Sequence, residues 1–112
     1  EKMELLVKKP KESLKELTIN DLQLTALYKL LDCQTVEMIN VSPFKEERIT
    51  MLVDENGKIN DKKYNFEILH GGINKTVLVG NVVFCGIDEN NQWTELNENQ
   101  IKFICKNFKQ KF

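Results

Sequence analysis

The residue types that most often do chemistry in proteins are scarce in this chain of 112 residues. Its single histidine, His70, precedes Gly71-Gly72, and its three cysteines, Cys33, Cys85 and Cys105, lie far apart in sequence. A nucleophilic Cys–His site would need one thiol beside His70 and a third group to orient the pair. Two of the cysteines fall on predicted apolar faces, where burial blunts thiol reactivity. We therefore interpret His70 as a turn residue and the cysteines as reduced thiols.

Sites for metals and phosphates are not indicated either. The cysteines form no C-x-x-C pair, which argues against a zinc site. The acidic stretches 54–57 and 88–91 lack the ligand spacing and the closing glutamate of a calcium loop, so both indicate turns. The segment 71–76 ends in Lys-Thr, but a strand is predicted after it, whereas a helix follows a phosphate loop. We expect no enzyme, no metal and no cofactor.

Charge and hydropathy narrow the class of partner. The 16 basic and 17 acidic residues nearly balance, and Arg48 is the only arginine. Nucleic-acid binders usually carry a basic stripe rich in arginine, so we do not expect such a partner. The apolar stretches are shorter than the roughly 18–20 residues that a bilayer span needs, and no signal peptide is evident. Together with the reduced cysteines, these features predict a cytoplasmic protein that does not enter membranes.

The spacing of apolar residues predicts strands in the first half of the chain and one amphipathic helix. Asn20 is a candidate N-cap for a helix over 21–31, whose apolar residues recur at helical spacing from Leu24 to Leu31. The Asn56-Gly57 pair favours a type I′ turn. The predicted strands are Met3–Lys8, Ser13–Ile19, Thr35–Val41 and Ile49–Val53, the last within a hairpin from Arg48 to Ile59.

The second half is predicted to hold a long central strand and a closing helix. Segment 61–69 is ambiguous between a short helix and an irregular stretch. Thr76–Ile87 is the most apolar run and predicts one buried strand with a bulge at Gly80. Asn97 begins an N-x-x-Q capping pattern for a helix over 97–108. The expected fold is a single α+β domain over 3–108: a mostly antiparallel sheet of about five strands with two main helices packed against it, and flexible ends at 1–2 and 109–112.

Two sets of side chains are candidates for binding. Tyr64, Trp93 and the Pro43-Phe44 loop could form an exposed apolar patch that anchors a partner protein. Alternatively, Arg48, Asn65, His70 and Lys75 could converge in a pocket for a small ligand such as a nucleotide. A homodimer through an exposed strand edge is a further open alternative.

The order of these segments resembles a family of small proteins of unknown function that is common on phages, prophages and plasmids of Gram-positive bacteria. The resemblance rests on the Asn56-Gly57-Lys58 turn, Asn65, the Val79-Gly80 element and the closing helix with Ile101. Phe66 departs from it, since a basic residue is expected there.

The resemblance implies an accessory protein in the cytoplasm of a bacterial host that acts by binding. The leading hypothesis is a non-enzymatic inhibitor of a host or defence protein, with a CRISPR component as one candidate target. The alternative is a protein that sequesters a small ligand or nucleotide.

Overall fold

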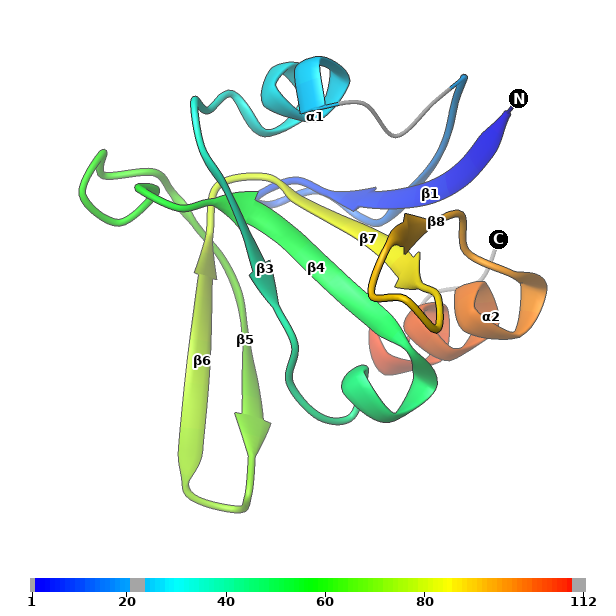
Figure 1. Ribbon diagram of the computed structural model, residues 1–112. Helices are drawn as coiled ribbons and strands as arrows, with labels where there is room; N and C mark the ends of the chain where they lie inside the picture. Colours follow the sequence, from blue (N-terminus) through cyan, green and yellow to red (C-terminus); the bar gives the residue numbers. More distant parts are fainter. Residues whose placement is uncertain (1, 21–23, 110–112) are drawn as a thin grey trace.

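A computed structural model describes residues 2–20 and 24–109, and it arranges them as two sheets and two α-helices (Figure 1). The elements, in chain order, are β1 Met3–Lys8, β2 Lys15–Ile19, α1 Leu24–Leu31, β3 Val36–Ile39, the 3₁₀ turn Lys45–Glu47, β4 Ile49–Asp54, β5 Tyr64–His70, β6 Asn74–Val79, β7 Val82–Ile87, β8 Trp93–Thr94 and α2 Glu98–Asn107.

The larger sheet has six strands and is antiparallel throughout. Its order is β2-β1-β7-β4-β3, and the short β8 also pairs with β7. Strands β5 and β6 form a separate two-stranded sheet. The predicted α+β class and the mostly antiparallel sheet are therefore confirmed, with one strand more than expected in the main sheet.

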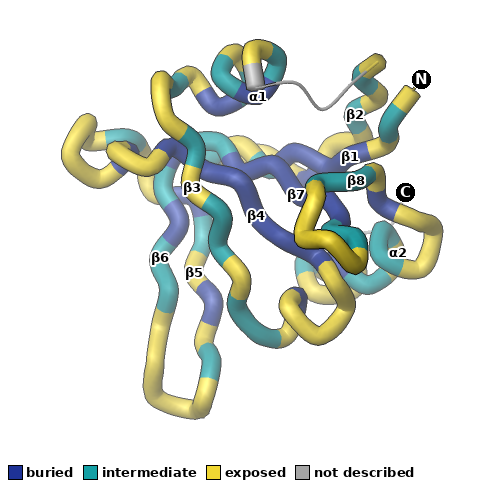
Figure 2. The backbone as a smooth tube through the Cα atoms, in the orientation of Figure 1, coloured by how far each residue is buried: buried dark blue, intermediate teal, exposed yellow. Residues whose placement is uncertain are grey.

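The main sheet is buried on both faces because its central strands are apolar at almost every position. All six residues of β4 are buried, and so are the first five of β7 (Figure 2). Successive side chains point to opposite faces, so Leu52 and Met51 of β4 belong to different layers. Each face of the sheet needs its own cover.

One face is covered by α1, and the other by α2 together with the β5–β6 hairpin (Figure 1). On the α1 side the buried residues are Leu5, Val7, Leu27, Leu31, Leu52, Val83 and Cys85. On the opposite side they include Leu6, Met51, Val53, Ile68, Leu78, Phe84 and Ile104.

Phe84 joins the elements of the second layer. Its ring lies 5.5 Å from that of Phe44, 6.2 Å from that of Phe66 and 5.8 Å from that of Phe108. These partners come from the loop before β4, from the hairpin and from the residue that ends α2. Phe66 thus packs in the core, which explains an aromatic residue where the resemblance led us to expect a basic one.

The predicted strand Thr76–Ile87 is two strands in different sheets. Gly80 adopts φ +73°, a left-handed conformation that glycine favours, and the chain turns there from β6 into β7. Both strands are apolar because both contribute to the core, so their combined sequence resembles one continuous strand.

The predicted hairpin from Arg48 to Ile59 is absent, since β4 has β3 and β7 as its neighbours. Neither Asn56 nor Gly57 has a positive φ, which a type I′ turn requires at both positions. Successive turns fill residues 55–61 instead. The ambiguous segment 61–69 is mostly strand: Tyr64–His70 forms β5, with a bulge between Tyr64 and Phe66.

The closing helix is confirmed, including its start. The Asn97 side chain accepts a hydrogen bond from the Gln100 backbone N–H at 2.8 Å, and Gln100 Oε1 accepts one from the Asn97 N–H at 2.9 Å. The predicted hairpin of β1 and β2 is also confirmed. The expected start of the first helix at 21–23 lies outside the described residues, and so do residues 1 and 110–112 of the ends that were expected to be flexible.

Candidate binding site

Two of the predicted binding residues, Phe44 and Asn65, have structural roles within the fold. Phe44 is only 3% exposed and packs in the core, so the Pro43-Phe44 loop does not present an aromatic anchor. Asn65 is buried, and its amide donates to the carbonyl oxygens of Lys8 and Gly80, each at 2.7 Å. It fixes the β5–β6 hairpin to the end of β1.

Arg48 is exposed, but its side chain is already engaged in hydrogen bonds within the protein. Its guanidinium donates hydrogen bonds to the carbonyl oxygens of Ile87 and Asp88, and so holds the loop after β7. Trp93 is half-buried and packs against the apolar layer beneath α1. Trp93 lies in β8, outside the hairpin that carries Tyr64, and Phe44 is buried, so Tyr64, Trp93 and Phe44 do not form the predicted exposed patch.

His70 and Lys75 lie near the tip of the hairpin. His70 Nε2 is 2.8 Å from Thr76 Oγ1, and Lys75 forms an ion pair with Glu67 at 3.6 Å. With Arg48 and Asn65 engaged elsewhere, the four polar candidates have their contacts in different parts of the fold. That set of side chains does not form a single pocket.

Large apolar side chains are exposed on and beside the β5–β6 hairpin. Tyr64 is 54% exposed and Ile73, in the turn, 89%. Across the described residues, four large apolar side chains are exposed: Ile59, Tyr64, Leu69 and Ile73. The register pairs Tyr64 with Val79, Glu67 with Val77 and Leu69 with Lys75, so these residues share the outer face of the hairpin. We call Ile59, Tyr64, Leu69 and Ile73 the hairpin patch.

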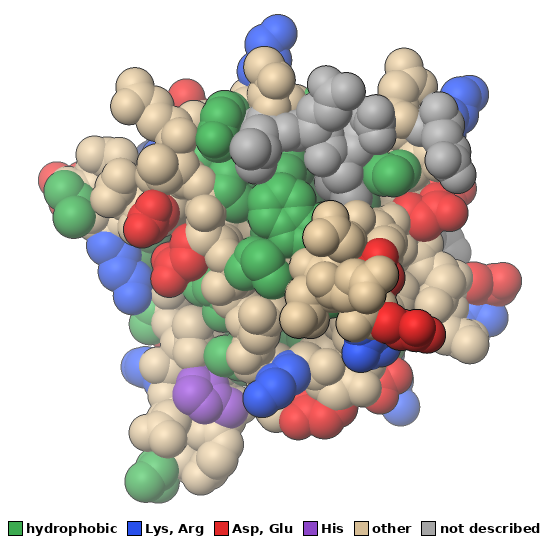
Figure 3. Space-filling view, in the orientation of Figure 1, with side chains coloured by type: hydrophobic (Ala, Val, Ile, Leu, Met, Phe, Trp, Pro, Cys, Tyr) green, Lys and Arg blue, Asp and Glu red, His purple; other side chains and the backbone are tan. Residues whose placement is uncertain are grey.

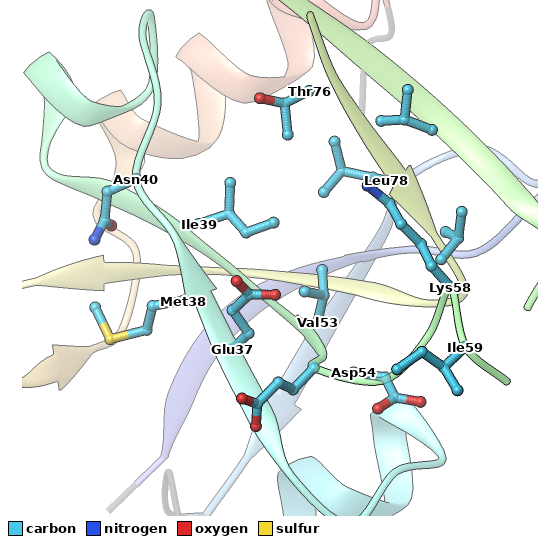
Figure 4. Close-up of a pocket in the computed structure, with 13 residues that line it drawn as sticks. Glu37, Met38, Ile39, Asn40, Val53, Asp54, Lys58, Ile59, Thr76 and Leu78 are labelled. Carbon is cyan, nitrogen blue, oxygen red and sulfur yellow. The ribbon is translucent and has the colours of Figure 1, made fainter.

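A cleft of about 430 Å³ separates the edge of the main sheet from the hairpin (Figure 4). One wall consists of Glu37, Met38, Ile39 and Asn40 from β3 and the residue after it, and another consists of Thr76, Val77, Leu78 and Val79 from β6. Both sets are consecutive. A strand that faced the cleft with one face would contribute only alternate residues. Each strand therefore presents its edge to the cleft.

The cleft combines an apolar interior with a charged rim. Figure 4 shows Ile39, Val53 and Leu78 between the two strands. The charged residues that line it are Glu37, Asp54, Glu55 and Lys58. Acidic side chains are also visible beside β3 in the space-filling view (Figure 3). The rim is therefore net negative.

Asp54, which lines the cleft, forms a buried ion pair with Lys62. Lys62 Nζ lies 3.0 Å from Asp54 Oδ2, and the side chains are 17% and 3% exposed for Lys62 and Asp54. Burial alone would raise the pKa of the Asp54 carboxyl, but the hydrogen bond from the Asn56 N–H and the contact with Lys62 outweigh it and lower the pKa. Asp54 stays ionised, and its charge is already compensated.

The cysteines are not poised for catalysis. Burial raises the pKa of the Cys85 thiol to about 12, and it also raises the pKa of Cys33 and Cys105. All three are free. Within residues 2–20 and 24–109, no three His, Cys, Asp or Glu side chains cluster as metal ligands would. No helix in the same residues is long and apolar enough to cross a membrane.

A family model matches residues 3–109, nearly the whole chain, and its description is "Domain of unknown function (DUF3846)". The chain belongs to the DUF3846 family. The expected resemblance to a family of unknown function is thus confirmed, whereas the association with phages and plasmids stays a prediction. Comparisons of this DUF3846 chain with curated proteins and with solved structures gave no significant match.

Sequence reasoning missed the cleft in this DUF3846 chain because it assigned Thr76–Ile87 to one buried strand. An open edge depends on which strands pair, and periodicity within one strand does not reveal its neighbours. Gly80 was the available signal. A glycine within an apolar run can mark the end of one strand as well as a bulge.

Proposed function

We propose that this DUF3846 protein acts by binding another protein, as a non-enzymatic inhibitor or adaptor in the cytoplasm of a bacterial host. The observation that supports this function is the hairpin patch. Exposed single apolar side chains are common on protein surfaces, but several that are confined to one segment of the chain favour an interaction site. Here the exposed large apolar residues of the described chain lie on one projecting hairpin or in the loop before it.

The hairpin is built to present these residues. Its inner face packs on the main sheet through Phe66, Ile68 and Leu78. Because side chains alternate along a strand, anchoring this face directs Glu67 and Leu69 outward, and the bulge between Tyr64 and Phe66 brings Tyr64 to the same side. Because the base of the hairpin is held in the core, the hairpin loses less conformational freedom on binding than a free segment would.

The alternative, sequestration of a small ligand, has less support. It rested on convergence of Arg48, Asn65, His70 and Lys75, and these residues have separate contacts. A target among host or defence proteins is part of the proposal and derives from the expected mobile-element context.

Affinity capture tests this function. The tagged full chain is incubated with bacterial lysate beside two variants, and retained proteins are identified by mass spectrometry. Leu69→Ser with Ile73→Ser removes apolar surface from the hairpin patch, whereas Lys102→Ser with Lys106→Ser changes two exposed residues of α2 as a matched control.

We expect a protein that is retained by the natural chain and by the α2 variant but reduced about tenfold or more with the hairpin variant, as loss of interface anchors predicts. The activity of that protein is then measured with and without the chain, since an inhibitor lowers it. Equal retention by all three chains would rule out the hairpin patch as the docking surface. A nucleotide retained in place of a protein would favour sequestration.

A further inference from the structure

Within the part of the chain that the structure describes, two strands on opposite sides of the cleft each pair with a neighbouring strand on one side only. Strand β3 is the last in the main sheet, and β6 pairs only with β5. Both face the cleft with four consecutive residues, as an edge does (Figure 4). An unpaired edge carries free backbone donors and acceptors, and it is a template for a further strand.

The hydrogen-bond pattern shows which groups of β3 are free. The Thr35 carbonyl accepts a hydrogen bond from the Glu55 N–H on the β4 side. Direction alternates along an antiparallel strand, so Glu37 and Ile39 also turn their backbone groups to β4. Val36 and Met38 turn theirs outward.

We propose that the cleft accepts an extended segment of the partner protein as an added strand, which pairs with β3 on one side and β6 on the other. The main sheet and the hairpin then become one continuous sheet. This inference rests on the proposed function, because it names how part of the partner is held. Ile59 belongs to the hairpin patch and also lines the cleft, so one partner can contact both.

The size of the cleft suits a short strand. Its volume of about 430 Å³ lies within the ~300–1,000 Å³ of typical ligand sites. Three residues of β3 and the residue after it line the cleft, and a strand of four residues spans about 13 Å at ~3.3 Å per residue. Alternate apolar side chains of the segment would pack on Ile39, Val53 and Leu78.

The rim selects the charge of the segment. Glu37 and Glu55 are exposed, and Asp54 is compensated by Lys62. Among the described residues that line the cleft, Lys58 is the one cation, so two carboxylates remain against one ammonium. Lysine or arginine at the alternate positions of the segment complements this rim. The occupant is therefore an extended basic and apolar segment.

A synthetic peptide tests this inference without the natural partner. The probe is a ten-residue peptide that alternates valine and lysine, and a valine–glutamate peptide of equal length is its control. Backbone amide shifts of the full chain are followed by NMR at rising peptide concentration. We expect saturable shifts in both β3 and β6 with the lysine peptide, and binding at least about tenfold weaker with the glutamate peptide.

Two double variants distinguish the effect of the charge at the rim on peptide affinity from the effect of the net charge of the whole protein. Glu37→Lys with Glu55→Lys reverses the rim, while Glu89→Lys with Glu98→Lys makes the same change of net charge at exposed sites away from the cleft. The rim variant is expected to lose affinity for the lysine peptide about tenfold and the control less than twofold.

Absence of shifts, shifts at only one of the two edges, or equal binding of both peptides would overturn the inference. So would a concentration-dependent dimer in sedimentation that perturbs the same β3 and β6 amides without peptide, since the occupant is then a second copy. If the peptide fails but lysate capture still depends on the hairpin patch, the inference falls and the proposed function stands.

Discussion

At the scale of residues, the ion pair of Asp54 and Lys62 is the most buried one in the described part of the chain. Lys62 also donates to the carbonyl oxygens of Leu31 and Asp32, just where α1 ends. A cation at the negative end of a helix is favourable. One ammonium thus joins α1, the end of β4 and the loop before the hairpin.

We expect Asp54→Asn to lower the free energy of unfolding at pH 7 by about 3 kcal/mol, because it leaves the Lys62 charge buried without its counterion. Urea denaturation measures this. Adding Lys62→Met should restore much of the loss, since removing both charges of a buried pair costs little. A single variant as stable as the natural chain would show that water replaces the carboxylate.

The same pair gives a pH dependence. The Asp54 pKa in the folded chain is below its usual 3.8, so the unfolded chain binds more protons between the two values and stability rises with pH there. The contribution is complete above about pH 4 and is lost as the pH falls through the folded pKa. The stability difference between Asp54→Asn and the natural chain should therefore narrow at pH 3. A difference independent of pH would contradict ionisation of Asp54.

At the scale of elements, Gly80 separates the hairpin from the main sheet. An added Cβ there would lie 2.9 Å from Lys62 Cδ, and φ is +73°. Gly72, in the hairpin turn, has φ +82° but nothing within 4 Å of an added Cβ. Both glycines adopt a left-handed conformation that would strain any other residue. Only at Gly80 would an added Cβ also meet a neighbouring side chain.

We expect Gly80→Ala to destabilise the protein by about 2 kcal/mol and Gly72→Ala by about 1 kcal/mol, because a left-handed residue with a Cβ costs about 1–2 kcal/mol and only Gly80 adds a steric contact. Thermal and urea unfolding measure both. Equal losses would mean that the Lys62 side chain moves aside freely.

Helices and strands could be predicted from the sequence where interactions between residues close in the chain determine them. Asn97 and Gln100 cap α2 with their own side chains, so the pattern was sufficient. The type I′ turn predicted from Asn56-Gly57 was wrong. The Asp54 carboxylate accepts a hydrogen bond from the Asn56 N–H, and Gly57 lies against Val79. Tertiary contacts override turn preference there. In β5, the bulge at Asn65 breaks the alternation that would have identified a strand.

The binding site was less predictable than the fold. Tyr64 is exposed as expected, but Phe44 and Asn65 resemble binding residues only until their packing is known. Aromatic and amide side chains occur in cores and in interfaces alike. The cleft could not be predicted, since it exists between β3 and β6, which are distant in sequence and unpaired.

At the scale of the whole molecule, β7 lies at the centre. It pairs with β1, β4 and β8, and both of its faces are covered. The hairpin is held at its base, through Asn65 and Phe66, and is exposed at its tip. Local stability should follow this gradient.

Amide hydrogen exchange measures that gradient. We expect β7 amides to exchange only through global unfolding, and those of residues 69–74 at least about 100-fold faster through local opening. The amides of β1 and β4 that pair with β7 serve as the internal reference. Uniform protection across β5, β6 and β7 would instead indicate that the hairpin and the sheet unfold as one unit.

The place of the hairpin in the topology has an evolutionary consequence. Strands β4 and β7 are antiparallel neighbours, and the segment 55–81 leaves the sheet after one and returns at the other. Inward residues such as Phe66 and Leu78 are constrained by the core, whereas outward ones such as Leu69 and Val77 are not. Homologous proteins can therefore acquire new targets through substitutions within a single contiguous stretch of coding sequence, while the main sheet and its core stay unchanged.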